Sequence, residues 1–539
     1  MLGGFGEILL EISFCVLGPI RLSFYVLIDG FSLCFLRFVL LISFVVMFYR
    51  FFYMRGDSTE TRFIVLVVLF VLSMCILILS PSLLRLIVGW DGLGITSFLL
   101  VIYYNNVASL RSGLVTIYIN RIGDIFIVLS MYYLFYWGWI GNEVYLLGIS
   151  IWFSVLILLA GITKSAQMPF SSWLPAAIIA PTPVSSLVHS STLVTAGVYI
   201  FIRFFYLMNW FLLRGPFLIV SVLTSFSAGI IACVEEDIKK LVAISTLRQL
   251  GLIMFSLSLG NLVYCFFHIV SHALFKALLF LSCGFCIMRS LGLQDIRFIG
   301  QKFSLNKGLT LMLFLANLSL CGFPFLSGFF SKDMIIEHSI SWDVVLLVWG
   351  LFLSSCILSV AYRIRVSYFG MLKFQLSSPR VLKVGGVLFI CPIVALYFWS
   401  ISLGKYVGKI LLDGEIYLYS NAEKLLGVGF LLIGFLLFWG TKFYSTFFVE
   451  ILYINFYWGY FISKNLNKFS YFIVGESYWL EYYGAKGLYR ALSSLVYWFI
   501  YLKASFKYSI LFGVLVFVLV FILLFSLLKV LFWRNKEGW

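Results

Sequence analysis

The chain has 539 residues, of which 63% are hydrophobic and only 11% are charged, and its mean hydropathy is +1.07. Apolar runs long enough to cross a bilayer recur along its length, so the composition indicates a polytopic α-helical membrane protein and excludes a soluble one. Lysine and arginine outnumber aspartate and glutamate by 38 to 22. These basic residues lie between the apolar runs, where they set orientation, which excludes a nucleic-acid-binding role.

The first residues differ from the rest of the chain. Two short runs on either side of Gly18–Pro19 predict a surface β-hairpin over residues 11–26. A basic segment and a small-residue cleavage site are missing from the start, so we expect no removable signal peptide. After the hairpin, hydropathy predicts about fourteen membrane helices. They are expected at residues 28–52, 62–80, 83–104, 110–136, 148–168, 183–208, 214–234, 238–259, 261–290, 308–334, 343–367, 384–402, 424–445 and 509–533.

Two acidic residues lie inside the early spans. Asp91 is in the third span and Asp124 is in the fourth. A carboxylate at membrane depth is costly unless it faces a partner or a polar cavity. Asp91 is the candidate counter-charge for a buried lysine, Lys164. Asp124 is either a second relay acid or a structural partner of Arg121, and both interpretations stand.

Lys164 is the most informative residue of the sequence. It lies near the end of a long apolar run that Pro169 interrupts. A charged group at this depth normally faces a protein-lined cavity and marks an ion or proton route. Burial favours the neutral amine and a nearby carboxylate favours the ammonium, so such a lysine can take up and release a proton.

The segment after this interruption holds a histidine and then a charged helix start. His189 begins the next helix, in the stretch 181–192. Further on, Asp237 is placed to cap a helix, and Lys240 is expected to point inward.

A second group of ionisable residues is His268, His272 and Lys276. Their spacing of four residues places them on one helical face, with about 6 Å between successive members. Three interpretations are open: a proton relay, packing histidines, or a metal site. A metal is disfavoured because no acidic or thiolate ligand lies next to the pair.

Lys332 and Asp333 follow a second interruption, at Gly322–Leu326. Two broken, lysine-bearing helices in one chain favour a transporter built from related halves.

The ten cysteines are scattered, and only Cys283 and Cys286 have a metal-like spacing, so buried packing cysteines are favoured. Motifs for haem, iron–sulfur, nucleotide or flavin binding are missing, so any electron carriers are expected on other chains.

The alternate loops differ in charge, with about fourteen basic residues on one side of the predicted membrane and about five on the other. Both termini are expected on the less basic side. Residues 446–508 mix aromatic and basic side chains and predict a helix along the membrane surface, with a loosely ordered loop as the alternative. The expected division is a hairpin (1–27), N-terminal helices (28–104), a first half (105–234), a second half (235–370), C-terminal core helices (371–445), a lateral helix (446–508) and a membrane anchor (509–539).

In motif order, residues 28 to 370 resemble the subunit 5 family of mitochondrial NADH:ubiquinone oxidoreductase, complex I. The long C-terminal extension is similar to the lateral helix and final anchor of that family. The motifs that carry the resemblance are Gly89–Gly94 (GWDGLG), Asn120–Asp124 (NRIGD), Thr163–Gln167 (TKSAQ), Trp173–Ala177 (WLPAA), Ala180–Thr192 (APTPVSSLVHSST), Asp237–Lys240 (DIKK), His268–Ala277 (HIVSHALFKA) and Gly328–Asp333 (GFFSKD).

The resemblance implies an antiporter-like core with inverted repeats and a mid-membrane row of protonatable residues. It implies proton pumping across the mitochondrial inner membrane, driven by NADH-to-ubiquinone electron transfer in other subunits. NAD, FMN, iron–sulfur clusters and ubiquinone are then expected on those subunits. The implied partners are the antiporter-like subunits 4 and 2 and membrane lipids such as cardiolipin, and the implied matrix side carries the basic loops and lateral helix. By motif, the implied relay residues are Asp91, Lys164, His189, Lys240, His268, His272, Lys276, Lys332 and Asp333.

Two departures from the family pattern accompany this resemblance. Asp91 stands where the family usually has a glutamate, and its shorter side chain predicts a bridging water. The chain begins at the hairpin, where family members usually have two more helices, so we expect no membrane helix before Ile28. Two other functional classes remain open: a stand-alone sodium/proton antiporter and a structural brace of the membrane arm.

Overall fold

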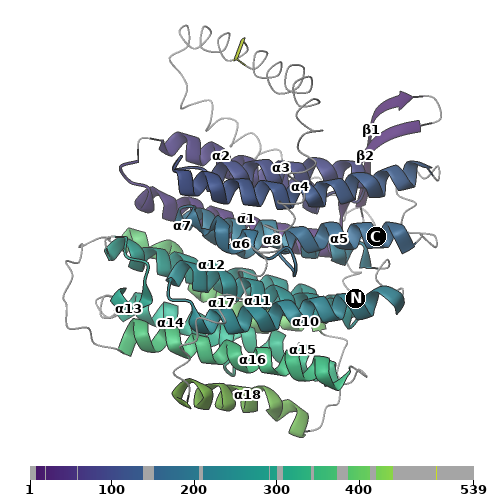
Figure 1. Cartoon of the computed structure of the whole chain (residues 1–539). Coiled ribbons are helices and arrows are strands. Elements are labelled where there is room, and N and C mark those ends of the chain that lie inside the picture. Colours follow the sequence, from purple (N-terminus) through teal and green to yellow (C-terminus); the bar gives the residue numbers. More distant parts are fainter. Residues whose placement is uncertain are drawn as a thin grey trace, which may run out of the picture. The chain divides into compact units, whose positions relative to one another are not determined.

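Apart from one hairpin, the described chain is helical (Figure 1). Nine of the described helices are long and apolar enough to span a membrane, and four shorter apolar helices accompany them. The polytopic helical fold predicted from composition is therefore confirmed, whereas the count of about fourteen spans stays a prediction. The computed structural model describes residues 8–17, 20–57, 59–136, 151–205, 211–290, 292–299, 307–340, 345–372, 387–412, 421–440 and 493–494.

The predicted hairpin consists of β1 (Ile8–Leu17) and β2 (Ile20–Ile28), paired antiparallel so that Ile8 lies opposite Ile28. Alternating and β-branched residues favour this extended structure. Asp29 follows β2 directly and ends the strand by capping α1: its carboxylate accepts from the Ser32 amide, and the Ser32 side chain accepts from the Asp29 amide. This capping box satisfies amides that a helix start leaves unpaired.

Four long helices follow the hairpin, close to the predicted ranges. Turns at Gly56, which has a φ of +103°, and at Asn105, with a φ of +52°, separate them. In space α2 packs against α3, α3 against α4, and α4 against the next helix, α5. Their bounds are Gly30–Tyr53 for α1, Glu60–Ile78 for α2, Leu83–Val101 for α3 and Val107–Tyr136 for α4.

The first broken segment begins with α5 (Ile151–Lys164), which ends at Lys164 itself and not at Pro169. The backbone turns where Ala166 has a φ of +53°. A continuous span, Thr182–Arg203, then runs back through the bundle. Two short helices, α6 (Trp173–Ala176) and η2 (Ala177–Ile179), precede this span. The span itself consists of α7 (Thr182–Leu187), η3 (Val188–Thr192) and α8 (Leu193–Arg203).

A long central helix, α12 (Leu262–Arg289), has its most apolar stretch entirely buried. It packs against α7, α11, α14 and α17, so side chains on all its faces meet other helices. The predicted span 308–334 is two helices, α14 and α15, separated at Gly322–Leu326. The remaining bounds are α10 (Phe211–Val234), α11 (Ile238–Ser258), α13 (Ile296–Ile299), α14 (Lys307–Cys321), α15 (Ser327–Ile340), α16 (Leu346–Ser367), η5 (Tyr368–Leu372), α17 (Val387–Leu412) and α18 (Asn421–Gly440).

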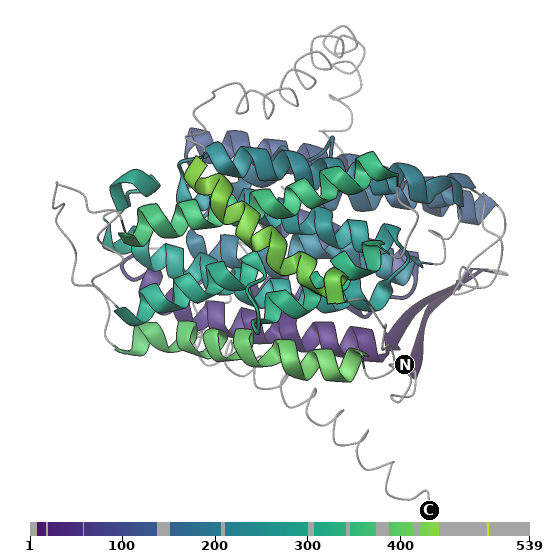
Figure 2. The same cartoon turned by 90° about the horizontal axis from the view of Figure 1, so that it is seen from below.

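The later helices return to earlier ones. The helix α17 packs beside α1, and α18 lies obliquely over α15 and α16 (Figure 2). All these elements belong to one unit, residues 1–456. The predicted lateral helix (446–508) and anchor (509–533) lie outside the described residues, except for Ser493 and Ser494.

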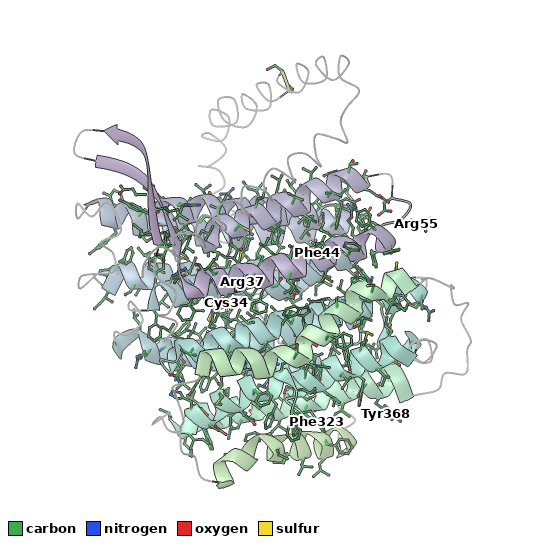
Figure 3. The ribbon with its side chains drawn as sticks, turned by 180° about the vertical axis from the view of Figure 1, so that it is seen from behind. Cys34, Arg37, Phe44, Arg55, Phe323 and Tyr368 are labelled. Atoms are coloured by element: carbon green, nitrogen blue, oxygen red, sulfur yellow. The ribbon has the colours of Figure 1, made fainter. Side chains whose placement is uncertain are left out.

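Large apolar side chains are exposed along the outer surfaces of the helices. Phe44 on α1 is 65% exposed, and Phe323 in the second interruption is 49% exposed (Figure 3). A water-exposed surface of this kind is unusual for a soluble monomer, whereas lipid or a neighbouring protein covers such side chains in a membrane.

A bidentate ion pair joins the start of α1 to the end of α8. The Arg203 guanidinium donates to both oxygens of Asp29, at 2.6 and 2.9 Å. Burial alone would raise the pKa of Asp29, but the hydrogen bonds and charge of Arg203 outweigh it and hold the pKa below 3.8. The pair therefore stabilises the fold at neutral pH, and this contribution is lost as pH falls through the lowered pKa.

Asp29→Asn is expected to lower the free energy of unfolding by about 3 to 5 kcal/mol, because it removes the carboxylate that neutralises the buried Arg203 charge. Detergent or thermal unfolding of the purified protein at neutral pH measures this loss. Asp295→Asn is the matched control: its partner Arg297 is 54% exposed, so the expected change is below about 1 kcal/mol. Equal losses in the two variants would contradict the assignment.

Candidate functional site

Lys164 is fully buried at the end of α5. Its ammonium donates to the Trp90 carbonyl oxygen at 2.6 Å and lies 4.0 Å from the centroid of the Trp90 ring. A cation in the last turn of a helix is favoured by the helix dipole, and an aromatic face adds a cation–π attraction. Trp90 therefore holds the lysine from the side of α3.

Asp91 was expected beside Lys164, but the carboxylate connected to this lysine through Trp90 is Asp124. Asp124 accepts from the Trp90 indole N–H at 2.7 Å and from Arg121 at 3.1 Å. Asp91 lies 3.8 Å from Arg121, and its side chain is 36% exposed. Among the described side chains, no carboxylate oxygen lies within 4.0 Å of Lys164 Nζ. The direct partner of Lys164 is thus Trp90, and Asp124 is connected to it through the indole.

The two carboxylates and Arg121 border a cavity of about 370 Å³ on the outer side of Trp90. Most of the cavity lining is apolar, but its three charged side chains, Asp91, Arg121 and Asp124, offer polar groups to which water can bind. Water in this cavity can reach Asp91 and Asp124. Its lining residues are Ile87, Trp90, Asp91, Arg121, Asp124, Ile125, Ile127, Val128 and Leu129.

His189 lies on the inner side of the first interruption, within the π-helical turn η3, and is buried. Its ring is 6.4 Å from the ring of Trp173, whose indole N–H donates to the Thr163 carbonyl at 3.0 Å. Trp173 thus lies between His189 and the residue preceding Lys164. Single π-helical turns often occur at functional sites, because they re-aim one side chain within a helix.

The predicted row on α12 is present. The rings of His268 and His272 have centroids 6.3 Å apart, and His268, His272 and Lys276 are all fully buried. Lys276 donates to the Ser245 hydroxyl at 2.6 Å and to the Val242 carbonyl at 3.2 Å. The spacing of four residues has placed the three side chains on one helical face.

His268 extends the row in two directions. One ring nitrogen, Nδ1, lies 2.8 Å from the Ser331 hydroxyl of α15, and Nε2 lies 3.2 Å from the Gln249 amide oxygen of α11. Since Ser331 precedes Lys332 in the chain, the α12 row continues into the second broken helix. Sequence analysis missed Ser245 and Gln249, although their spacing of four residues in an apolar helix signals a polar face.

Lys332 is 5% exposed and reaches across the second interruption. Its ammonium donates to the carbonyls of Leu320 at 2.7 Å and Cys321 at 3.1 Å, which are the last residues of α14. Terminal helix carbonyls lack partners within their own helix, so the lysine satisfies them and meets the negative end of the dipole. Asp333 is partly buried and lies against Gly427 of α18.

The inward orientation expected for Lys240 is wrong. Lys240 is 48% exposed at the start of α11 and pairs with Asp237 at 2.7 Å. Asp237 is at the N-cap position, but its side chain makes no capping hydrogen bond. The Asp237 carboxylate instead pairs with Lys240, one helical turn later in the chain. The buried lysine at this helix start is the neighbouring residue, Lys239.

Two buried arginines, on α11 and α16, were not predicted. Arg248 on α11 is fully buried, and Arg363 on α16 is 1% exposed and donates to the Asn317 side chain at 2.9 Å. Arg248 lies in a largely apolar run of α11, and a charge in such a run was a signal of a buried group.

Within the described ranges, no group of three or more His, Cys, Asp or Glu side chains is arranged to hold a metal ion. His268 instead uses both ring nitrogens toward Ser331 and Gln249.

Comparison with known proteins gives concordant results. Residues 80–358 match the family described as NADH:quinone oxidoreductase/Mrp antiporter, and residues 14–64 match the complex I chain 5 N-terminus. A solved structure of the Mrp complex from Dietzia sp. DQ12-45-1b has a similar fold, with a TM-score of 0.72 at 21% identity, covering 86% of this chain and 55% of that one.

Two relatives share the description NADH-ubiquinone oxidoreductase chain 5. The Anopheles gambiae protein is 49% identical over 356 residues, which are 64% of this chain and 60% of the mosquito protein's length. The Locusta migratoria protein is 38% identical over 513 residues, 87% of this chain and 86% of its own length. The chain belongs to the family of NADH-ubiquinone oxidoreductase chain 5.

Proposed function

We propose that this chain is a proton-translocating subunit in the membrane arm of a respiratory NADH–ubiquinone oxidoreductase. The observation that carries the proposal is the buried row from Lys276 through His272 and His268 to Ser331 and Lys332. Ionisable groups at membrane depth mark ion or proton routes, and family membership supports the same function.

The row suits protons better than larger cations. Imidazole and amine groups exchange protons within hydrogen-bond reach or through one water, whereas a sodium site needs several oxygen ligands. Lys164, with Asp91 and Asp124 beside the outer cavity, would form the first station. His189 would connect it to Lys276, and Lys332 with Asp333 would form the last station. Lys240 is left out of the relay because it is half-exposed and paired with Asp237.

The driving reaction would be NADH oxidation by ubiquinone on other subunits, which would hold NAD, FMN and the iron–sulfur clusters. The chain would lie in the mitochondrial inner membrane, with the basic loops on the matrix side. The side chains of Asp91 and Arg121 are 36% and 49% exposed and form a charged surface. Because charges that face lipid are costly, this surface supports a protein partner there. The antiporter-like subunits 4 and 2 are the proposed neighbours, with cardiolipin at the remaining basic edges.

Purification from native membranes tests the proposal. The chain is expected to travel with a large NADH-oxidising assembly, and proton translocation by that assembly in sealed vesicles is expected to be independent of sodium. Recovery of the chain alone, with sodium-dependent proton exchange, would favour the stand-alone antiporter instead.

Residues 446–508 are proposed to lie along the matrix surface against the neighbouring subunits, with 509–533 as their anchor. Deleting the chain from Tyr453 onward is expected to loosen the distal arm during detergent extraction, because many modest contacts are lost together, while electron transfer persists. Native gels after mild solubilisation measure arm retention. A truncated protein that assembles and pumps normally would show that the segment is neither clamp nor coupling element.

A further inference from the structure

Arg248 is a fully buried guanidinium next to the proposed relay. It lies on α11 between Ser245, which binds Lys276, and Gln249, which contacts His268. Residues three and four apart share a helical face. The α11 face that contacts the relay therefore carries a permanent positive charge.

The surroundings of Arg248 are basic. Its charge acts on His268 and Lys276 of α12, on Lys332 of α15 and on Cys321 at the end of α14. Arg363 of α16 is the other permanent charge of this cluster. Among the described residues, no carboxylate oxygen lies within 4.0 Å of the cationic nitrogens of Arg248, Lys276 or Lys332.

An arginine in this position has a different consequence from a lysine. A guanidinium stays protonated in proteins, whereas a buried lysine gives up its proton readily. Like charges in a low-dielectric interior repel strongly, so each proton added to the row beside Arg248 is opposed by a charge that never leaves.

We propose that Arg248 is a positioning residue for the relay: its fixed charge limits how many protons the row from Lys276 to Lys332 holds, so that one proton leaves as another enters. The inference rests on the proposed proton-translocating function. It assigns to Arg248 neither proton carriage nor contact with a substrate.

The test compares Arg248→Gln with the unmodified complex reconstituted in sealed vesicles. Proton translocation per NADH oxidised is measured from acidic to alkaline pH. Without the arginine charge the row holds its protons more tightly, so the pH profile of translocation is expected to move by about one unit or more to higher pH. Arg248→Lys, which can lose its charge, is expected to move the profile in the same direction by a smaller amount.

Arg50→Gln is the matched control. Arg50 of α1 is also buried, but it donates to the main-chain carbonyl of Glu60 at the start of α2. Its replacement is therefore expected to leave the pH profile of translocation unchanged. An unshifted Arg248→Gln profile, or a uniform loss of rate without a shift, overturns the proposal. If the glutamine variant does not assemble, Arg248→Lys decides alone, and an unshifted profile overturns the proposal.

Lys332→Met separates this inference from the function on which it rests. If Lys332→Met and Lys164→Met both still translocate protons normally, the proposed function fails. If Lys332→Met stops translocation and Arg248→Gln leaves the profile unshifted, only the role of Arg248 fails.

Discussion

Methionine in place of Lys164 is expected to stop most proton translocation while the assembled complex continues to oxidise NADH. Methionine fills a similar volume in the buried site but carries no proton, so the proposed route beside Trp90 would be interrupted. We expect translocation to slow by at least about tenfold, which corresponds to about 1.4 kcal/mol in the barrier. The ratio of protons moved to NADH oxidised in sealed vesicles measures the effect.

Lys332→Met is expected to act in the same way at the other end of the row. Lys240→Met makes the identical chemical change at a half-exposed residue, and it is expected to leave the ratio unchanged. Normal ratios in both Lys164→Met and Lys332→Met would contradict the relay and favour a structural brace.

Alanine at position 197 is expected to destabilise the protein and disturb the Lys164 site together. A Cβ on Gly197 would lie 2.7 Å from the Gly161 carbonyl oxygen and 2.9 Å from the Ser165 amide nitrogen. Backbone atoms cannot rotate away, so α8 and α5 must separate beside Lys164. Overpacking of this kind lowers the free energy of unfolding by about 1 to 3 kcal/mol. Thermal unfolding of the purified complex and its proton-to-NADH ratio measure the two effects.

Gly350→Ala is the matched control in α16. Nothing lies within 4 Å of its added Cβ, and alanine favours a helix over glycine by up to about 1 kcal/mol. Its expected effect on stability is neutral or slightly favourable. A Gly197→Ala protein as stable as the control would show that α5 and α8 do not approach so closely.

Local patterns predicted the features that depend on one element. The hairpin followed from two alternating runs, and the shared face of His268, His272 and Lys276 followed from a spacing of four residues. Lys164 and Lys332 stood out because a charge in an apolar run is costly in a membrane. In each case the physical signal is contained within a few consecutive residues.

Features that depend on contacts between helices were not predictable in the same way. The partner of Lys164 is a main-chain carbonyl and an aromatic face, which leave no charge pattern in the sequence. Asp91 and Asp124 are the same residue type, and only the packing of α3 against α4 puts Asp124 on the Trp90 indole. The two lysines at the start of α11 are adjacent, so a small error in helix phase exchanges the buried one for the exposed one.

The bond from Lys332 to the end of α14 makes the backbone sensitive to charge. If the ammonium gives up a proton, as the proposed relay requires, its hydrogen bonds to the carbonyls of Leu320 and Cys321 lose their charge assistance and weaken. The helices α14 and α15 are then held together less firmly, and more firmly again when a proton returns. Protonation of one nitrogen would thereby change the stiffness of the joint between two helices, which neighbouring helices can sense without exchanging any atom with it.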